Sequence, residues 1–180
     1  MTVSDKPLVN RVANSGLVTV NLEDYHPVGE VLEFDLKDYL FMGLILKEKE
    51  FRQAMKEHDW TRYEGCHLAV RCSADAVIPL WAYMLVTVHA SPFAAGVHQG
   101  AAEEVVRHLY LKRIDELDVI AYEGQRIVIK GCSGKPVPPA AYMALTAKLL
   151  PVAASIMFGE PCSTVPIYKA LRREDTGAPA

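Results

Sequence analysis

The chain has 180 residues, of which 51% are apolar and 23% are charged, and its formal net charge is −3. These values are typical of a globular protein, and we expect one domain over residues 1–180 with a frayed polar tail at residues 171–180. The slight acidic excess argues against a nucleic-acid partner, because neutralising phosphates requires a clear excess of Lys and Arg.

Neither a secretory signal nor a membrane span is expected. Polar residues such as Asp5 and Asn10 interrupt the first twenty residues, where a signal peptide needs an unbroken apolar run. The longest apolar stretch, residues 140–158, is broken by Lys148 and Pro151, and predicts a buried helix followed by a buried strand. We therefore expect a cytoplasmic protein whose four cysteines are free thiols or metal ligands.

Two elements are predicted in the first sixty residues. LVTVNLEDY, from residue 17, is rich in β-branched residues and predicts a strand. FDLKDYLFMGLILKEKEFRQAMKEH predicts a long helix that starts near Asp35, with apolar positions on one face and KEKE towards solvent.

An internal repeat, in which residues 63–100 resemble residues 122–159, is the most distinctive feature of the chain. YEG occurs in both copies, and CSADAVIPLWAYM, from residue 72, corresponds to CSGKPVPPAAYM, from residue 132. Shared preferences of strands and helices would explain the apolar matches, but not these landmarks in one order. The pattern therefore indicates an internal duplication.

Each copy predicts a strand, an apolar helix between two prolines, and a second strand. A connection of this length joins parallel strands by a right-handed crossover. Between the copies, AAEEVVRHLYLKRIDELD predicts a further amphipathic helix. We therefore expect a three-layer α/β fold with a mostly parallel sheet, built from the duplicated βαβ unit plus the N-terminal strand and long helix.

Three of the four cysteines follow predicted strands at one end of this sheet. Cys72 and Cys132 begin the two repeated phrases, and Cys162 lies in GEPCSTVPIYK, where Pro161 and Ser163 suggest a helix start. If the strands before Cys72 and Cys132 are neighbours, their backbones lie about 4.8 Å apart. Both sulfurs could then bind one ion at about 2.3 Å. The carboxyl ends of parallel strands are also where such sheets bind ligands.

Three thiolates at one edge would form a soft site suited to zinc, iron or an iron–sulfur cluster. A fourth ligand could be Asp75, Glu160, a histidine, water or a partner molecule, and an open fourth position would favour chemistry or transfer. Two other interpretations remain open. One is a metal-free thiol enzyme, in which a helix N-terminus activates one of these cysteines. The other is a protein-interaction module whose cysteines are structural.

The remaining residues give weaker signals. Cys66 precedes a predicted strand at the opposite end from the other cysteines, and we expect it in the core. The six histidines form no H-x-x-x-H or H-x-H pair, and His98 is the most interesting because its predicted strand approaches the expected crevice. The phosphate-binding and nucleophile-elbow motifs G-x-x-x-x-G-K-[ST], G-x-G-x-x-G and G-x-S-x-G do not occur.

The runs FDLKDYLFMGLILKEKEFR, KEHDW, CSADAVIPLWAYM, IKGCS and FGEPCSTVPIYK resemble a bacterial domain family of unknown function. The resemblance extends from about Asn10 to Lys169. Genes of that family often lie beside those for SUF-type iron–sulfur cluster assembly. The resemblance therefore implies iron or cluster handling by the three cysteines, with iron–sulfur assembly proteins as partners. It implies no role for any single residue.

An apolar content of 51% leaves room for a homo-oligomer interface.

Overall fold

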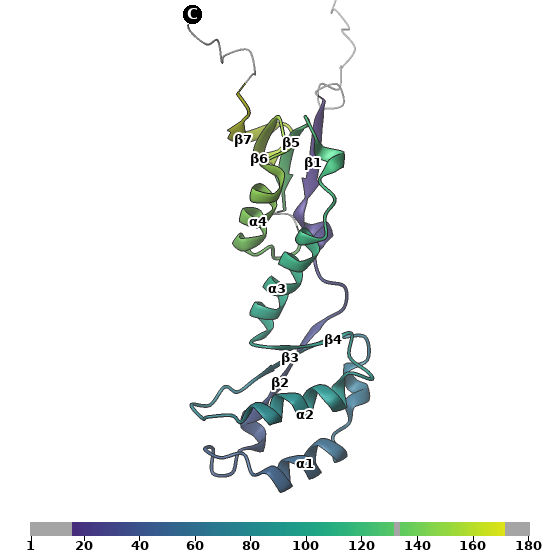
Figure 1. The fold of residues 1–180 in the computed structure, drawn as a ribbon, viewed down its shortest axis with the longest axis vertical. Helices are drawn as coiled ribbons and strands as arrows, with labels where there is room; N and C mark the ends of the chain where they lie inside the picture. The colour runs from purple at the N-terminus through teal and green to yellow at the C-terminus, as the bar shows by residue number, and fades with distance from the viewer. Residues whose placement is uncertain (1–15, 132–133, 172–180) are drawn as a thin grey trace, which may run out of the picture. The chain divides into compact units, whose positions relative to one another are not determined.

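The computed structural model describes residues 16–131 and 134–171, which form two compact units (Figure 1). Unit 1 consists of the chain up to His26 and from Leu111 onwards, and unit 2 is Pro27–Tyr110. Length and composition predict one domain over residues 1–180. That prediction requires the two units to unfold together, which the experiment at the end of this subsection tests. Except for Leu171, the predicted polar tail at residues 171–180 lies outside the described residues.

Each unit has its own sheet. In unit 1 the strand order is β1-β5-β6-β7, and in unit 2 it is β2-β3-β4; every pairing is parallel except that of β6 with β7. The strands are β1 (Leu17–Asn21), β2 (Val31–Asp35), β3 (His67–Arg71), β4 (Gly96–Gln99), β5 (Arg126–Lys130), β6 (Ser155–Glu160) and β7 (Ser163–Lys169). The helices are α1 (Glu48–Glu57), α2 (Leu80–Ala90), α3 (Ala102–Asp115) and α4 (Pro139–Leu149). The predicted α/β class with mostly parallel strands is confirmed, although the strands form two sheets and not one.

The predicted repeat corresponds to two βαβ units, β3-α2-β4 and β5-α4-β6. Each element of the second begins 59 residues after its counterpart, as residues 67 and 126 for the first strands and 80 and 139 for the helices show. The glycine of each YEG turn has φ near +70°, which only glycine adopts readily. The backbone N–H of Gly65 donates to Phe93, and that of Gly124 donates to Val152, so the turns are held in the same way.

The duplication extends to a segment that the sequence analysis divided between a strand and a helix. NLEDY, at residues 21–25, and DLKDY, at residues 35–39, each end a strand and form a short 3-10 helix. The side chains of Asn21 and Asp35 accept a hydrogen bond from the backbone two residues later. The strands before them, β1 and β2, pair in parallel with β5 and β3. Each unit therefore contains one complete copy.

The long helix predicted from Asp35 is wrong in its extent. Asp35 is the last residue of β2, a 3-10 turn follows it, and only Glu48–Glu57 is helical, as α1. Between them lies a tight turn in which Phe41, Met42, Leu44 and Ile45 are exposed, Leu46 is buried, and Met42 adopts a positive φ of 52°. The apparent helical periodicity thus came from a turn that separates two short elements.

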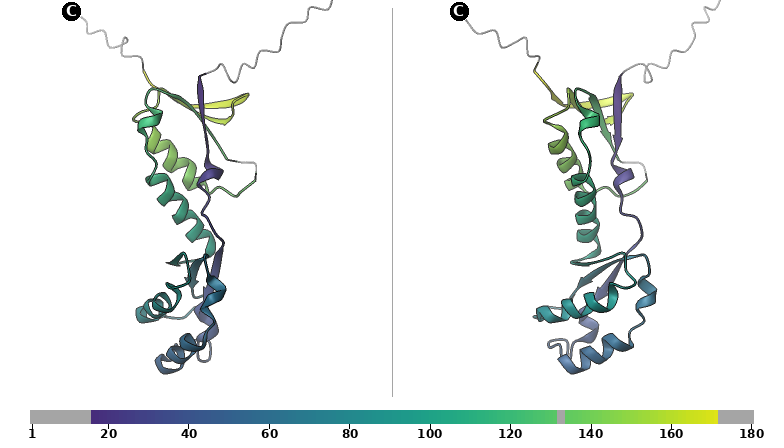
Figure 2. Two further views of the ribbon diagram at one scale, coloured as in Figure 1. Left: turned by 90° about the vertical axis from the view of Figure 1, so that its right-hand side faces the viewer. Right: turned by 45° about the vertical axis from the view of Figure 1, so that its right-hand side comes forward.

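Three layers are present in unit 2. Helices α1 and α2 lie side by side on one face of β2-β3-β4 (Figure 1, Figure 2), and residues 105 and 109 of α3 pack on the other face. Under α1 and α2, Phe34 stacks on Tyr39 and Trp60 at 5.3 and 5.4 Å between ring centroids. The imidazole of His58 makes hydrogen bonds of 3.3 Å to the hydroxyls of Tyr39 and Tyr63, and burial lowers the pKa of His58.

Equivalent core positions recur in unit 1. Ile127 and Ile129 of β5 correspond to Leu68 and Val70 of β3, and each is at most 3% exposed. Among the described helices, none is long and apolar enough to span a membrane.

Replacing Leu68 by Ala should lower the free energy of unfolding of unit 2 by roughly 2–5 kcal/mol, because it removes buried methyl groups and leaves a cavity. Amide hydrogen exchange should become faster in β2, β3 and β4 and keep its rate in β5 and β6. Ile127→Ala is the matched experiment in unit 1, and should give the opposite pattern. Equal acceleration in both sheets would mean that the units unfold as one domain.

Candidate functional site

A pocket of about 760 Å³ opens at the carboxyl ends of β3 and β4 in unit 2. Parallel α/β sheets bind ligands at this edge, so the location agrees with the expected crevice. The wall is formed by the connection from β3 to α2, the first turns of α2, and the connection from β4 to α3. The lining residues are Arg71, Cys72, Ala74, Ala76, Ile78, Leu80, Tyr83, Gln99, Gly100, Ala101 and Glu104.

Of the three cysteines in the described residues, Cys72 alone lines this pocket. It follows the last residue of β3 directly, its side chain is half-buried, and its Sγ lies 3.5 Å from the carbonyl oxygen of Ala74. Helix α2 begins only at Leu80. The N-terminus of α2, which would favour a thiolate, is eight residues away along the chain, although Leu80 and Tyr83 from the start of α2 line the same pocket as Cys72.

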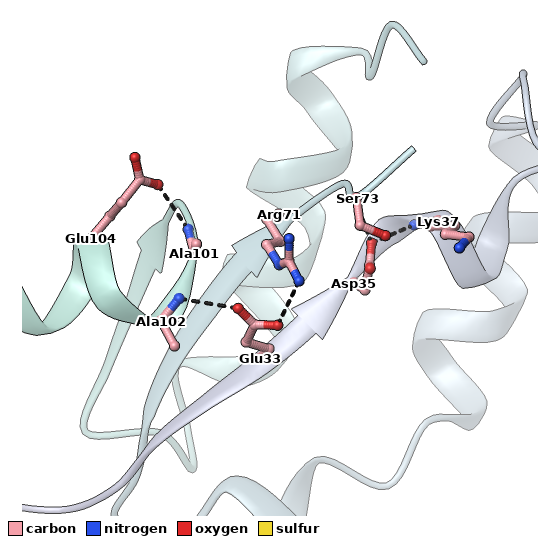
Figure 3. Close-up of polar contacts among 8 residues, drawn as sticks. All are labelled: Glu33, Asp35, Lys37, Arg71, Ser73, Ala101, Ala102 and Glu104. Carbon is pink, nitrogen blue, oxygen red and sulfur yellow. Dashed lines mark hydrogen bonds and ion pairs between the residues drawn. The ribbon is translucent and has the colours of Figure 1, made fainter. Parts of the chain in front are cut away.

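Asp35 fixes the start of the loop that carries Cys72. One oxygen of its carboxylate accepts hydrogen bonds of 3.0 Å from the backbone N–H of Ser73 and of Lys37 (Figure 3). Burial alone would raise the pKa of Asp35, but the hydrogen bonds from Ser73 and Lys37, helped by the charge of Arg71, lower it. The carboxylate thus ties the ends of β2 and β3 to the loop.

Glu33 links the sheet to the first turn of α3. Its Oε2 forms an ion pair of 3.0 Å with Arg71, and its Oε1 accepts a hydrogen bond of 3.1 Å from the N–H of Ala102 (Figure 3). Glu104 completes the cap by accepting from the N–H of Ala101 at 2.9 Å, as in a capping box. These donors of the helix N-terminus are therefore satisfied by carboxylates of the chain itself.

The charges at this edge are mostly acidic. The charges of Glu33, Asp35 and Glu103 act on Arg71, whose pKa is raised chiefly by its hydrogen bond and ion pair with Glu33. The Nε of Arg71 is buried and has no hydrogen-bond partner among the described residues. The carboxylates around Arg71 and in the pocket wall would favour a neutral or cationic ligand over an anion.

The corresponding edge of unit 1 carries Glu160 and Cys162. Glu160 is the last residue of β6 and pairs with Lys130, the last residue of β5, at 3.4 Å. Cys162 is exposed in the two-residue connection between β6 and the antiparallel strand β7. The helix expected to start at Cys162 is therefore wrong, because the chain turns back as a hairpin.

The expected three-cysteine site rests on a strand pairing that does not occur. Cys72 follows β3, whose neighbours are β2 and β4, whereas Cys132 follows β5, whose neighbours are β1 and β6. The 59-residue offset also pairs Cys72 with Gly131, one residue before Cys132, which itself lies outside the described residues. Among the residues that the structure describes, no three His, Cys, Asp or Glu side chains form a group that could hold a metal ion.

The structure also places Asp75 and Cys66, which the sequence analysis considered, and Glu33 and Asp35, which it did not. Asp75 is exposed in the connection between β3 and α2, and it does not line the pocket. Cys66 lies just before β3, at the opposite end as expected, but it is half-buried and not in the core. The sequence analysis missed Glu33 and Asp35, because it placed them before and at the start of a helix. The NLEDY and DLKDY similarity was the signal that could have located them on a strand.

Comparison with protein-family models gives one family, described as "Protein of unknown function (DUF2480)", whose model matches residues 6–170. The chain belongs to this family. The match covers both units, including β1 and β7 at the two ends of the described fold. Comparison with curated proteins and with solved structures gives no match. Family membership therefore assigns no reaction and no ligand.

Replacing Asp35 by Ala should lower the free energy of unfolding by roughly 0.5–2 kcal/mol, because the backbone N–H groups of Ser73 and Lys37 lose their acceptor. Asp35→Asn is the matched control, since Asn21 makes the equivalent bond in unit 1.

The stability should also depend on pH through Asp35. Its pKa is lowered on folding, so the ionised carboxylate stabilises the fold above the unfolded pKa of 3.8, and this contribution is lost as the pH falls. Denaturant titrations at several pH values measure both effects. If the Ala variant were as stable as the Asn variant, the hydrogen bonds from Ser73 and Lys37 to residue 35 would not contribute to stability.

Proposed function

We propose that the protein binds a transition metal or an iron–sulfur cluster through cysteine thiolates at the carboxyl ends of its parallel strands, as a cytoplasmic accessory to iron–sulfur cluster assembly. The register of β5 and β6 carries the proposal. These neighbouring parallel strands end at Lys130 and Glu160, and a cysteine follows each end by two residues: Cys132 and Cys162. Thiolates at adjacent strand ends form a ligand set that soft metal ions prefer.

Two thiolates of one chain leave the coordination of such an ion incomplete. One candidate for a further ligand is Glu160, whose exposed carboxylate would have to exchange its ion pair with Lys130 for the ion. A dimer is the other way to complete the site. A second copy of the chain would supply two more thiolates, and four thiolates complete a zinc or iron–sulfur site. An apolar groove of about 730 Å³ beside α4 offers that copy a surface, with Met143, Phe158 and Ile167 exposed in it. Cys72 belongs to the other sheet and is not required.

The proposal is tested by measuring the metal content and visible absorption of protein purified without oxygen and without a His-tag. The wild type should contain zinc, iron or a cluster at a defined ratio to the chain. Cys132→Ser and Cys162→Ser should each lose it, because each removes one ligand. Cys72→Ser is the matched control and should keep it. Sedimentation of the loaded protein should show a dimer.

If the wild-type protein contained no metal, the proposed metal site would be refuted. Equal loss of metal in the Cys72→Ser control would show that the ligand set is the wider one, with Cys72, Cys132 and Cys162 acting together. Loss in neither Cys132→Ser nor Cys162→Ser would exclude the strand ends of unit 1.

A second candidate function is favoured by the pocket in unit 2. Cys72 is the thiol that faces the 760 Å³ pocket, beside the hydroxyl of Tyr83, whose pKa burial raises. In this alternative the pocket binds a small neutral or cationic molecule, and Cys72 is the group that reacts with it or coordinates it. Activation of Cys72 would then come from the bound ligand or from the start of α2, whose Leu80 and Tyr83 line the same pocket.

The rates at which single thiols react with iodoacetamide test this alternative. Cys66 is the matched control, since it is also half-buried and lies at the other end of β3. If the pocket concentrates small molecules at Cys72, that thiol should react at least several-fold faster than Cys66 in metal-free protein. Equal rates would leave Cys72 as a packing residue. Mass spectrometry of tryptic peptides gives the rate for each cysteine.

A further inference from the structure

The pocket of unit 2 can be compared with the same place in unit 1, because the two βαβ units are copies. At the 59-residue offset, Cys72 corresponds to Gly131 and Tyr83 to Tyr142. In unit 1 the hydroxyl of Tyr142 donates a hydrogen bond of 2.8 Å to the carbonyl oxygen of Gly131. This bond ties the first turn of α4 to the end of β5.

Unit 2 does not make the equivalent bond. Tyr83 lines the 760 Å³ pocket, and among the described residues its hydroxyl has no hydrogen-bond partner. A Cβ built at Gly131 would lie 3.0 Å from the hydroxyl oxygen of Tyr142, closer than a carbon and an oxygen normally approach. Cys72 has such a Cβ. The hydroxyl of Tyr83 therefore stays away from the backbone and available to a ligand.

Cys72 takes part in the packing that keeps Tyr83 in this position. It lies in one hydrophobic cluster with Leu36, Ile78 and Tyr83, which are the counterparts of the residues around Gly131. The difference between the two copies is thus a single side chain at the end of the first strand. It is the Cβ of residue 72, and not its sulfur, that occupies the space left empty in unit 1.

The charges of the pocket are arranged against an anion. Arg71 is the one cationic side chain in the wall, and Glu33 pairs with it at 3.0 Å. The backbone N–H groups of Ala101 and Ala102, at the start of α3, donate to Glu104 and Glu33. Both kinds of group that would bind an anion are therefore engaged by carboxylates of the chain.

Glu104 places a carboxylate in the pocket wall (Figure 3). Its Oε2 accepts from the N–H of Ala101 at 2.9 Å, and a Cβ at residue 100 would lie 2.8 Å from that oxygen. Gly100, with a φ of 128°, is thus required beside it. No described residue donates a hydrogen bond to the other oxygen, Oε1. A cationic group in the pocket would find an acceptor there.

Tyr83 and the connection that follows β3 supply the rest of the site. Burial, and next the charge of Cys72, raise the pKa of Tyr83, so its phenol stays protonated at neutral pH. The phenol oxygen can accept from an N–H group, and the ring offers its face to a cation. The remaining wall is largely apolar, and the volume of 760 Å³ suits a small molecule.

We propose that this pocket binds a small organic cation. Tyr83 and Glu104 bind its ammonium group, and its apolar part packs against Ala74, Ala76, Ile78 and Leu80. The inference rests on the pocket of the second candidate function, whose ligand class it names, but it does not require Cys72 to react. It is independent of the thiolates of unit 1.

The test is a titration of the full, tag-free, ¹⁵N-labelled chain with benzylammonium, followed by the amide signals in NMR spectra. The amides of Ala74, Gly100 and Ala101 should shift and reach saturation. Benzoate has a similar size and the opposite charge, and should bind several-fold more weakly, with uncharged benzyl alcohol between the two. If benzylammonium gave no saturable shift at these amides, or if benzoate bound as tightly, the proposal would be overturned.

Two substitutions test the groups that bind the ammonium. Glu104→Gln should weaken benzylammonium binding roughly two- to fivefold, as expected for an exposed ion pair, while Gln still caps α3. Glu57→Gln removes the same charge from α1, outside the pocket, and should bind as the wild type does. Tyr83→Phe should also weaken binding, whereas Tyr142→Phe, its counterpart in unit 1, should not. Unchanged affinity in either Glu104→Gln or Tyr83→Phe would overturn the assigned contacts.

A pair of variants at residue 72 tests why the site is open. Cys72→Ala keeps the Cβ and should bind benzylammonium about as tightly as the wild type. Cys72→Gly should bind several-fold more weakly, because Tyr83 can then donate to the backbone as Tyr142 does in unit 1. Equal affinities in the two folded variants, checked by circular dichroism, would overturn this role of residue 72. If Cys72→Gly does not fold, weaker binding by Cys72→Ala than by the wild type would overturn it.

The cation site and the reactive thiol can fail separately. If benzylammonium binds but iodoacetamide alkylates Cys72 no faster than Cys66, the cation site stands and the reactive-thiol function is refuted. If Cys72 is alkylated faster but benzylammonium does not bind, the cation site is refuted and the reactive-thiol function stands.

Discussion

The parallel pairing of one added strand with each βαβ unit is the constraint on which the rest of the structure depends. An isolated pair of strands is at best marginally stable, and a third strand enlarges the apolar face that each unit can bury. Strand β2 supplies a third strand to unit 2, and β1 supplies it to unit 1, although the whole of unit 2 lies between β1 and β5 in the chain. In both cases an Asn or Asp at the strand end holds the 3-10 turn that follows.

This arrangement divides the chemistry of the chain between two carboxyl edges. The edge of β2-β3-β4 holds the pocket with Cys72, and the edge of β5-β6 holds Glu160 and Cys162. The first edge is organised by the carboxylates of Glu33 and Asp35, which anchor Arg71, the Cys72 loop and the start of α3. These polar contacts hold the strands, the Cys72 loop and the first turn of α3 in place around the pocket.

The two copies have also diverged in ways that bear on function. Unit 2 contains α1 and a histidine between two tyrosine hydroxyls, as well as the histidines on its other face. In unit 1 the helix that precedes the YEG turn is α3, whose residues from Leu111 onwards belong to this unit, and unit 1 adds β7, which forms the hairpin that carries Cys162. Equivalent folds thus place thiols differently: Cys72 directly follows β3 in unit 2, and Cys162 lies in the β6–β7 hairpin of unit 1.

The sequence by itself determined the α/β class, the two βαβ units and most of their bounds, because these depend on local signals. HLAVR is β3 residue for residue, and the prolines and YEG turns mark the ends of the repeated elements. It also indicated that cysteines follow strands. The helix predicted from Asp35 failed because the periodicity of a short segment cannot distinguish a helix from a strand and a turn.

Only the tertiary structure decided which strands are neighbours, since strand pairing depends on contacts far apart in the chain. It separated β3 from β5, and so removed the reason for joining Cys72 to Cys132, whereas it made β5 and β6 adjacent. It also brought together Glu33 with Arg71, and His67 with His98 and His108, none of which has a recognisable spacing. A local pattern specifies each element, but side chains from different elements meet only where packing and register place them.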